Sequence, residues 1–259
     1  MRRIFTTTDE AVGTIILNHP ESRNSLSCQM LEEMRQALVG FGEQDVRAVV
    51  IRAQPGATVW SSGFNIHELP VSGRDPLSYN DPLECLLREV QRFPAPVIAM
   101  IEGSVWGGAC DLTFICDIAI GCPATSFAIT PAKLGLPYNV SGIMHFINIV
   151  GPRIAREMFY TAEPITARRA LQVGILNHLV PVAELESFTR AMTRRITVNS
   201  PLANRVMKEQ LRLLADALPL RTETFEYIQG LRRIVYDSED YQEGKQAFLE
   251  KRKPVFQGK

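Results

Sequence analysis

The 259-residue chain lacks the patterns that identify metalloproteins and nucleotide-dependent dehydrogenases. It has no Cys-x-x-Cys pair and no His-Glu-x-x-His motif, and its four histidines are dispersed. We therefore expect no metal site. The segment GSVWGG at residues 103–108 lacks the spacing of the dinucleotide-binding glycine motif, which argues against a nicotinamide cofactor.

Long apolar runs and a surplus of charge are also missing. The chain carries 28 Lys and Arg against 28 Asp and Glu, so it offers no basic surface of the kind that binds nucleic acid. No apolar run approaches the length of a bilayer span, and the start MRRIFTTTDE lacks the apolar core of a secretory signal. The five scattered cysteines are typical of reduced cytosolic thiols. We expect a cytoplasmic protein that binds neither nucleic acid nor a membrane.

The first two thirds of the chain alternate between strand-like and helix-like segments. Ser27 or Ser25 is a candidate cap for one helix, and Asp81 with Pro82 opens another. Interleaved strands and helices favour an α/β layered core. Apolar β-branched runs predict strands, and helical spacing of apolar residues predicts helices. The predicted strands lie at 11–19, 46–53, 96–103 and 118–122, and the predicted helices at 26–44 and 81–93.

The last third, from about residue 152, has mainly helical spacing. Isolated amphipathic helices need a surface on which to bury their apolar faces. These helices therefore either cover the sheet or form an interface between copies of the chain. The predicted helices lie at 153–162, 166–174, 182–199, 202–218, 222–238 and 239–252.

Two glycine-containing turns follow predicted strands, at EGSVWGGACDL (102–112) and SSGFNIHELP (61–70). Ligands of α/β proteins tend to bind at such strand ends. A glycine turn that opens a helix exposes unpaired N–H groups, so it suits an oxyanion site. It is equally a tight turn that only allows close packing. Two N–H groups aimed at one point would stabilise the enolate of a thioester.

Four segments together resemble the crotonase, or enoyl-CoA hydratase/isomerase, superfamily over nearly the whole chain. The resemblance implies an α/β fold with a crotonase-like spiral ββα core at 1–195 and a helical C-terminal trimerisation region at 196–259. It implies an acyl-CoA thioester as substrate and a homotrimer, or a dimer of trimers, as the assembly. The segments are NSLS (24–27), SSGFNI (61–66), EGSVWGGACDL (102–112) and FAITPAKLGLPYN (127–139).

The resemblance also assigns roles to individual residues. The backbone N–H groups of Phe64 and Gly108 would hold the thioester carbonyl. Tyr138 matches a tyrosine that the family places against a substrate carboxylate, although its spacing alone fits a buried structural aromatic as well. The residues expected to line the substrate site are Arg23, Asn24, Ser25, Leu26, Ser62, Gly63, Asn65, Ile66, Gly107, Asp111, Pro131, Phe248 and Lys251.

Some of these assignments have plain alternatives. Arg23 would meet a phosphate or is an exposed turn residue. Lys251 and Phe248 would contact the CoA nucleotide or belong to an amphipathic terminal helix with a solvated lysine. Arg74, Asp75 and Tyr79 lie in a polar loop that either covers the acyl pocket or is solvated.

The residues at two positions decide between the reactions of the superfamily. A hydratase needs two glutamates to handle water, and the matching positions here hold Asp111 and Pro131. Proline transfers no proton, and aspartate is one methylene short and could equally brace the helix start. Decarboxylation needs no general base, only a carboxylate held out of the thioester plane and a stabilised enolate.

The resemblance implies the decarboxylation of methylmalonyl-CoA, or of a related short 2-alkylmalonyl-CoA, to the acyl-CoA and CO2, and the residues at these two positions argue against hydration. No cofactor is expected, because the thioester itself accepts the electrons. The alternatives are another acyl-CoA reaction, such as isomerisation or hydration, and a non-catalytic acyl-CoA-binding protein.

One residue departs from the pattern of the superfamily members that decarboxylate methylmalonyl-CoA. They have histidine where this chain has Phe64. The backbone N–H survives that change, but the pocket becomes more apolar. This either favours loss of CO2 by desolvation, alters the choice of substrate, or weakens the decarboxylase.

Overall fold

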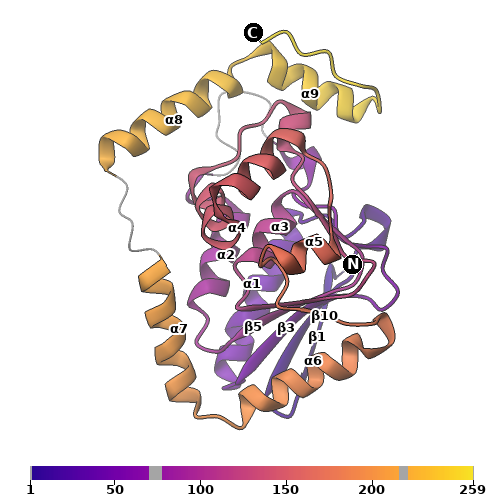
Figure 1. The fold of residues 1–259 in the computed structure, drawn as a ribbon, viewed down its shortest axis with the longest axis vertical. Coiled ribbons are helices and arrows are strands. Elements are labelled where there is room, and N and C mark those ends of the chain that lie inside the picture. Colours follow the sequence, from indigo (N-terminus) through magenta and orange to yellow (C-terminus); the bar gives the residue numbers. More distant parts are fainter. Residues whose placement is uncertain (1, 70–77, 216–220, 259) are drawn as a thin grey trace.

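The computed structural model describes residues 2–69, 78–215 and 221–258 (Figure 1). A six-stranded sheet, with strand order β1-β2-β3-β5-β7-β10, forms the centre of the fold. Strands β1 and β2 pair antiparallel, and the other pairs of this sheet are parallel. Its strands are β1 (Ile4–Asp9), β2 (Val12–Leu17), β3 (Ala48–Ala53), β5 (Val97–Ile101), β7 (Ile118–Gly121) and β10 (His178–Leu179).

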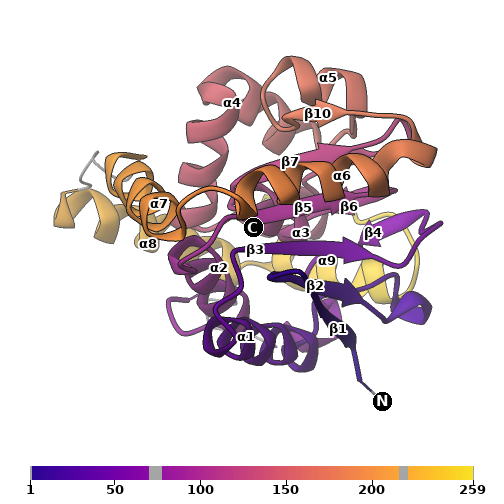
Figure 2. The same cartoon turned by 90° about the horizontal axis from the view of Figure 1, so that it is seen from below.

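Helices cover both faces of this sheet, as a parallel sheet requires. In β3, Val49 and Ile51 point into a core that includes residues of helices α1 to α4, whereas Val50 joins a second cluster with Leu185 of α6. Figure 2 shows α6 along one face and α1 with α2 on the other side. The helices of the core are α1 (Cys28–Glu43), α2 (Pro82–Arg92), α3 (Gly108–Phe114), α4 (Val140–Thr161), α5 (Ala167–Gln172) and α6 (Val182–Thr197).

A smaller sheet of short strands, in the order β4-β6-β8-β9, lies beside the first. Its strands β4, β6 and β8 run parallel, and β9 is antiparallel to β8. The parallel pairing matters for the site, because it brings the carboxyl ends of β4 and β6 together. Its strands are β4 (Val59–Ser61), β6 (Ser104–Trp106), β8 (Ser126–Ala128) and β9 (Ile165–Thr166).

The helix starts follow the caps expected from the sequence. The Ser27 side chain accepts a hydrogen bond from the N–H of Met30 at 3.2 Å, and Asp81 accepts one from the N–H of Leu83 at 2.9 Å. Each cap satisfies one of the N–H groups that a helix start leaves unpaired. Three 3-10 turns also occur, at Pro20–Ser22, Ile66–Glu68 and Pro131–Leu134.

Several elements were not predicted. In β1 only Ile4 is buried, so the strand has no apolar alternation. The first half of α4 was also missed, because the sequence indicated a helix only from residue 153. The structure has one long helix that is broken at Gly151, where φ is 71° and ψ is 166°. Strands β4, β6 and β8 have three residues each, which is too short for a periodic signal.

The last helices extend away from the central sheet (Figure 1). They are α7 (Pro201–Ala215), α8 (Thr222–Tyr236) and α9 (Glu239–Leu249). Buried Lys208 ties α7 to the core: its Nζ donates to the carbonyls of Val90 and Ala95 at 3.1 and 3.0 Å and lies 2.7 Å from Asp117. The expected boundary after residue 195 falls inside α6, and the division into two units stays a prediction.

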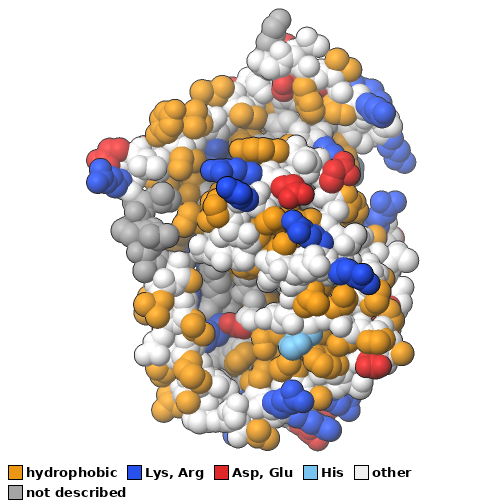
Figure 3. All heavy atoms as spheres, viewed as in Figure 1, with side chains coloured by type: hydrophobic (Ala, Val, Ile, Leu, Met, Phe, Trp, Pro, Cys, Tyr) orange, Lys and Arg blue, Asp and Glu red, His pale blue; other side chains and the backbone are white. Residues whose placement is uncertain are grey.

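The faces of α7 and α8 carry many exposed apolar side chains, several of which are visible on the left of Figure 3. No helix in the described ranges is both long and apolar enough to cross a bilayer. The exposed apolar residues of the two helices are Leu202, Val206, Met207, Leu211, Leu213, Leu214, Phe225, Tyr227, Leu231 and Ile234.

Candidate active site

Two backbone turns meet beside the small sheet. The turn after β4 contains Gly63 and Phe64, and the turn after β6 contains Gly107 and leads into α3 at Gly108. The strands that carry the turns are hydrogen-bonded neighbours. The glycine turn leads into a helix start, as predicted, but the strand directly before it is β6, which the sequence did not indicate.

Glycine is required at two positions of this contact. Gly63 has a φ of 84°, and a Cβ there would collide with the carbonyl oxygen of Trp106 and lie 3.1 Å from the amide nitrogen of Gly108. Gly107 has a φ of 51° and a ψ of −125°, and it caps α3 without a side chain. L-residues with a Cβ rarely adopt such positive φ values. The close approach of the two turns depends on these glycines.

The approach places two unused N–H groups side by side. A bridge between Leu26 and Phe64 uses the N–H of Leu26, which donates to Gly63 at 2.8 Å, and the N–H of Asn65, which donates to Leu26 at 3.2 Å. The N–H of Phe64 takes no part in it, and the N–H of Gly108 opens a helix and has no acceptor in that helix. Within the described ranges neither N–H has a partner.

These two peptide groups are close enough to serve one oxygen. A Cβ built on Gly108 would lie 3.6 Å from the amide nitrogen of Phe64. One donor at the start of a helix and a second one in the neighbouring turn suit an oxygen on which negative charge develops. The oxyanion hole expected from the sequence stays a prediction, and the closeness of the two peptide groups is compatible with it.

A small, mostly apolar cavity of about 70 Å³ adjoins the two turns. It brings together seven residues predicted for the site, namely Ser62, Phe64, Ile66, Gly107, Gly108, Pro131 and Tyr138. Sequence reasoning missed the other lining residues, which are Leu69, Leu83, Thr130, Leu134, Leu136, Pro137 and Tyr236. Four of these seven, Thr130, Leu134, Leu136 and Pro137, lie in the segment FAITPAKLGLPYN, so that motif could have indicated them. Leu83 and Tyr236 come from distant helices.

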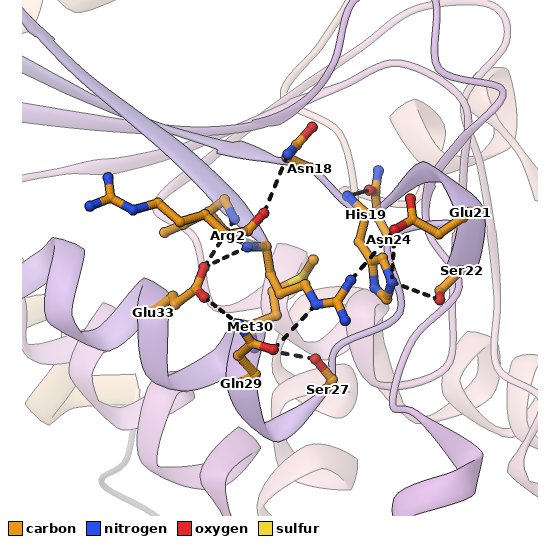
Figure 4. Close-up of polar contacts among 12 residues, drawn as sticks. Arg2, Asn18, His19, Glu21, Ser22, Asn24, Ser27, Gln29, Met30 and Glu33 are labelled. Atoms are coloured by element: carbon orange, nitrogen blue, oxygen red, sulfur yellow. Dashed lines mark hydrogen bonds and ion pairs between the residues drawn. The ribbon is translucent and has the colours of Figure 1, made fainter.

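The loop before α1 supports the cavity wall without lining it. Asn24 is buried, and its Oδ1 accepts from the N–H of His19 at 2.8 Å (Figure 4). Its Nδ2 donates to the carbonyl of Trp60 at 3.1 Å. The carbonyl of Arg23 accepts from the N–H of Ser62 at 2.9 Å. Ser25 and Leu26 are buried in the same loop. The loop and the 61–66 turn thus form one unit.

The remaining predicted residues lie elsewhere. Gly63 and Asn65 flank Phe64 but are not among the cavity-lining residues. Phe248 is 49% exposed on α9, and Lys251 is exposed just after that helix with a φ of 55°. Their contact with a CoA nucleotide stays a prediction.

The predicted covering loop is only partly described. Arg74 and Asp75 lie outside the described residues. The exposed ring of Tyr79 stacks against the guanidinium of Arg88 at 3.9 Å. Among the described residues, no group of three or more His, Cys, Asp or Glu side chains could hold a metal ion.

Tyr138 is held rigidly in the cavity wall. Its ring packs against Phe146 and Phe159 at centroid distances of 5.7 and 5.2 Å, and Gly142 leaves no room for a Cβ beside it. None of the described residues hydrogen-bonds with its hydroxyl. Burial raises the pKa of Tyr138 well above its usual value, and the nearby Asp111 raises it further. The phenol is therefore a neutral donor that has no acceptor in the described part of the chain.

Asp111 does not line the cavity. Its side chain is 1% exposed, and its Oδ1 lies 2.7 Å from Nδ1 of His145 on α4. His145 had no signal in the sequence, because it belongs to the half of α4 that was not predicted. The structure thus turns Asp111 toward another helix.

Comparison with known proteins places the chain among acyl-CoA enzymes. A model of the enoyl-CoA hydratase/isomerase family matches residues 7–259. The chain is 49% identical to methylmalonyl-CoA decarboxylase of Escherichia coli (strain K12), over 95% of each chain. It is 32% identical to the mitochondrial enoyl-CoA hydratase domain-containing protein 3 of Homo sapiens, over 95% of this chain and 81% of the relative.

Solved structures give the same picture. The structure of methylmalonyl-CoA decarboxylase in complex with 2-nitronate-propionyl-CoA superposes with a TM-score of 0.97 and 48% identity, over 99% of both chains. The structure of methylmalonyl-CoA decarboxylase complexed with 2S-carboxypropyl-CoA has a TM-score of 0.97 and 47% identity, over 100% of this chain and 99% of that one. These similarities confirm the expected fold class.

The raised pKa of Tyr138 gives a testable prediction. Burial and the neighbouring acids oppose the phenolate. The phenol should therefore stay protonated at about pH 10, where a typical tyrosine ionises. The difference in absorbance at 295 nm between the wild type and Tyr138→Phe measures this ionisation. Tyr227→Phe, at an exposed position, is the matched control. A Tyr138 phenolate that forms at or below about pH 10 would contradict the prediction.

Proposed function

The chain belongs to the enoyl-CoA hydratase/isomerase family, and we propose that it decarboxylates methylmalonyl-CoA or a related short 2-alkylmalonyl-CoA. One observation carries the proposal. Two backbone N–H groups and a buried phenol, none of which has a hydrogen-bond partner among the described residues, border the same small cavity. The relative that shares 49% identity is a methylmalonyl-CoA decarboxylase.

The geometry suggests how each group acts. The thioester oxygen accepts hydrogen bonds from the N–H groups of Phe64 and Gly108. The Tyr138 hydroxyl donates to the substrate carboxylate and holds it out of the thioester plane. The bond between the carboxylate and the α-carbon then breaks, and its electron pair moves into the thioester to form an enolate that the two N–H groups stabilise. CO2 leaves, and protonation of the α-carbon yields the acyl-CoA.

The cavity wall favours this step over hydration. Phe64, Leu83 and Pro131 surround the reacting carbons with apolar surface. A carboxylate in such a place loses hydration, whereas neutral CO2 has little hydration to lose. Pro131 has no proton to transfer to or from water. The thioester accepts the electron pair, so no metal or organic cofactor enters the proposal.

The CoA part of the substrate would lie along the loops at 23–26 and 62–66. Arg23 and Lys251 are the proposed phosphate contacts, and Phe248 would lie against the adenine. The exposed side chains of α9 and of the segment after it support these assignments. The cytoplasmic location expected from the sequence stays a prediction.

The assembly we propose is a homotrimer, alone or paired into a hexamer. The exposed apolar faces of α7 and α8 support it, because a monomer would leave them in water. Leu211, Leu214 and Ile234 are among the side chains that a second copy would cover.

A substrate panel tests the reaction. CO2 release from methylmalonyl-CoA, ethylmalonyl-CoA and malonyl-CoA is measured together with hydration of crotonyl-CoA, and release from at least one malonyl thioester is expected. Tyr138→Phe should lower this rate about ten- to a thousandfold and change the affinity for an unreactive CoA analogue only modestly, because it removes an orienting hydrogen bond. Crotonyl-CoA hydration without any CO2 release would refute the proposed function.

Matched variants test the oxyanion hole. Gly108→Pro removes a donor at a helix position that proline suits, and it should slow decarboxylation roughly a hundredfold or more. Gly108→Ala is the matched control, because it keeps the N–H. Both variants add a Cβ that contacts Leu83, so they differ in the donor. Phe64→Ala keeps its N–H and should retain measurable turnover. Equal rates in folded Gly108→Pro and Gly108→Ala would show that this N–H is not needed.

Sedimentation tests the assembly. At micromolar concentration the wild type should show no dominant monomer, since the apolar faces of α7 and α8 would be covered by other copies. Ile234→Glu places a charge on the exposed face of α8 and should shift the distribution toward smaller species. A wild type that sediments as a stable monomer would contradict the proposed trimer.

A further inference from the structure

A buried polar cluster lies behind the wall of the acyl cavity. Glu84 on α2 is buried and accepts hydrogen bonds from Asn139 at 2.6 Å and from Ser141 at 2.8 Å. Asp111 on α3 pairs with His145 on α4 at 2.7 Å. The proposed reaction gives neither pair a role, although buried carboxylates are costly to maintain.

The cluster adjoins the place where the substrate carboxylate would lie. Asp111 is one helical turn after Gly108, and residues three apart share a face of a helix. Leu83 packs against Gly108, on that face of α3, and also lines the cavity. Glu84 is the next residue after Leu83 in the chain. Tyr138 precedes Asn139, which bonds to Glu84. Tyr138 thus lines the cavity and also lies near both carboxylates, which act on its phenol.

The hydrogen bonds indicate where the charge of the Asp111–His145 pair resides. Nδ1 of His145 faces the carboxylate of Asp111, so it donates. Nε2 of His145 lies 3.1 Å from the side-chain nitrogen of Gln91, which can only donate. A neutral imidazole satisfies both contacts, and the negative charge then belongs to Asp111. The groups that act on the Tyr138 phenol, namely Asp111, Cys110 and Glu84, are all acids.

We propose that His145 is a positioning residue that fixes the Asp111 carboxylate behind Tyr138, where its charge opposes the substrate carboxylate. This inference rests on the proposed function. The repulsion weakens binding of the intact malonyl thioester and disappears when the carboxylate leaves as neutral CO2. The charge meanwhile moves to the thioester oxygen, where two N–H groups receive it. The pair therefore raises the rate of cleavage at the expense of ground-state affinity.

Binding of two isosteric probes tests the inference without turnover. One is 2-carboxypropyl-CoA, a thioether that keeps the carboxylate, and the other is its uncharged amide, 2-carbamoylpropyl-CoA. Their affinities are measured by calorimetry, and the ratio isolates the effect of the carboxylate charge. Asp111→Asn should shift the ratio in favour of the carboxylate by roughly five- to tenfold, as expected for removal of one nearby charge partly screened by the protein. The same variant should lower kcat.

Variants at His145 separate positioning from simple support. In His145→Leu the carboxylate of Asp111 loses the partner that holds it in place, so the ratio should change in the same direction as in Asp111→Asn. His145→Asn keeps a neutral donor near the position of Nδ1 and should restore the wild-type ratio. The double variant Asp111→Asn, His145→Leu should equal Asp111→Asn, because the two residues act as one unit.

The outcomes distinguish this inference from the proposed function. The inference would be overturned if Asp111→Asn left the affinity for the carboxylate probe relative to the amide probe unchanged or lowered it. A His145→Asn variant that behaves like His145→Leu would also overturn it. A merely structural role predicts weaker binding of both probes and no change in their ratio. A wild type that binds both probes but releases no CO2 would refute the proposed function, while the ratio would still report on the charge of Asp111.

Discussion

The close approach of the chain at Gly63 to the start of α3 is the contact on which the site depends. Parallel pairing of β4 with β6 brings the two turns to one edge, and the missing Cβ at Gly63 lets them touch. The peptide groups of Phe64 and Gly108 lie close together as a result, and neither needs a side chain to hold its N–H in place. An N–H donor belongs to the peptide group, so it is present whichever non-proline side chain follows Gly63.

The sequence indicated the elements that carry their own local signal. The helices α1 and α2 have apolar periodicity and side-chain caps at Ser27 and Asp81, and both were predicted and are confirmed. The apolar β-branched runs of β3 and β5 were equally clear. Strand β1 was missed because nearly all its side chains are exposed. The small sheet was missed because its strands gain their regularity only from pairing with each other.

The same distinction applies to the site. Phe64, Gly108 and Tyr138 lie in recognisable motifs, and the structure brings all three to one cavity. Leu83, Tyr236 and His145 lie in no motif, because their positions follow from the packing of α2, α8 and α4. Asp111 and His145 are 34 residues apart, and only the contact of α3 with α4 joins them. An alignment of motifs places Asp111 where a hydratase has its glutamate, but it does not show which way the carboxylate points.

Tyr236 gives the cavity a wall from the last residue of α8. During synthesis on the ribosome, the two glycine turns and Tyr138 emerge in the first part of the chain, whereas this wall emerges close to its end. A nascent chain can therefore fold its sheet and form its two turns while the cavity is still open to water on one side. The cavity gains this part of its wall only when synthesis of the chain is almost complete.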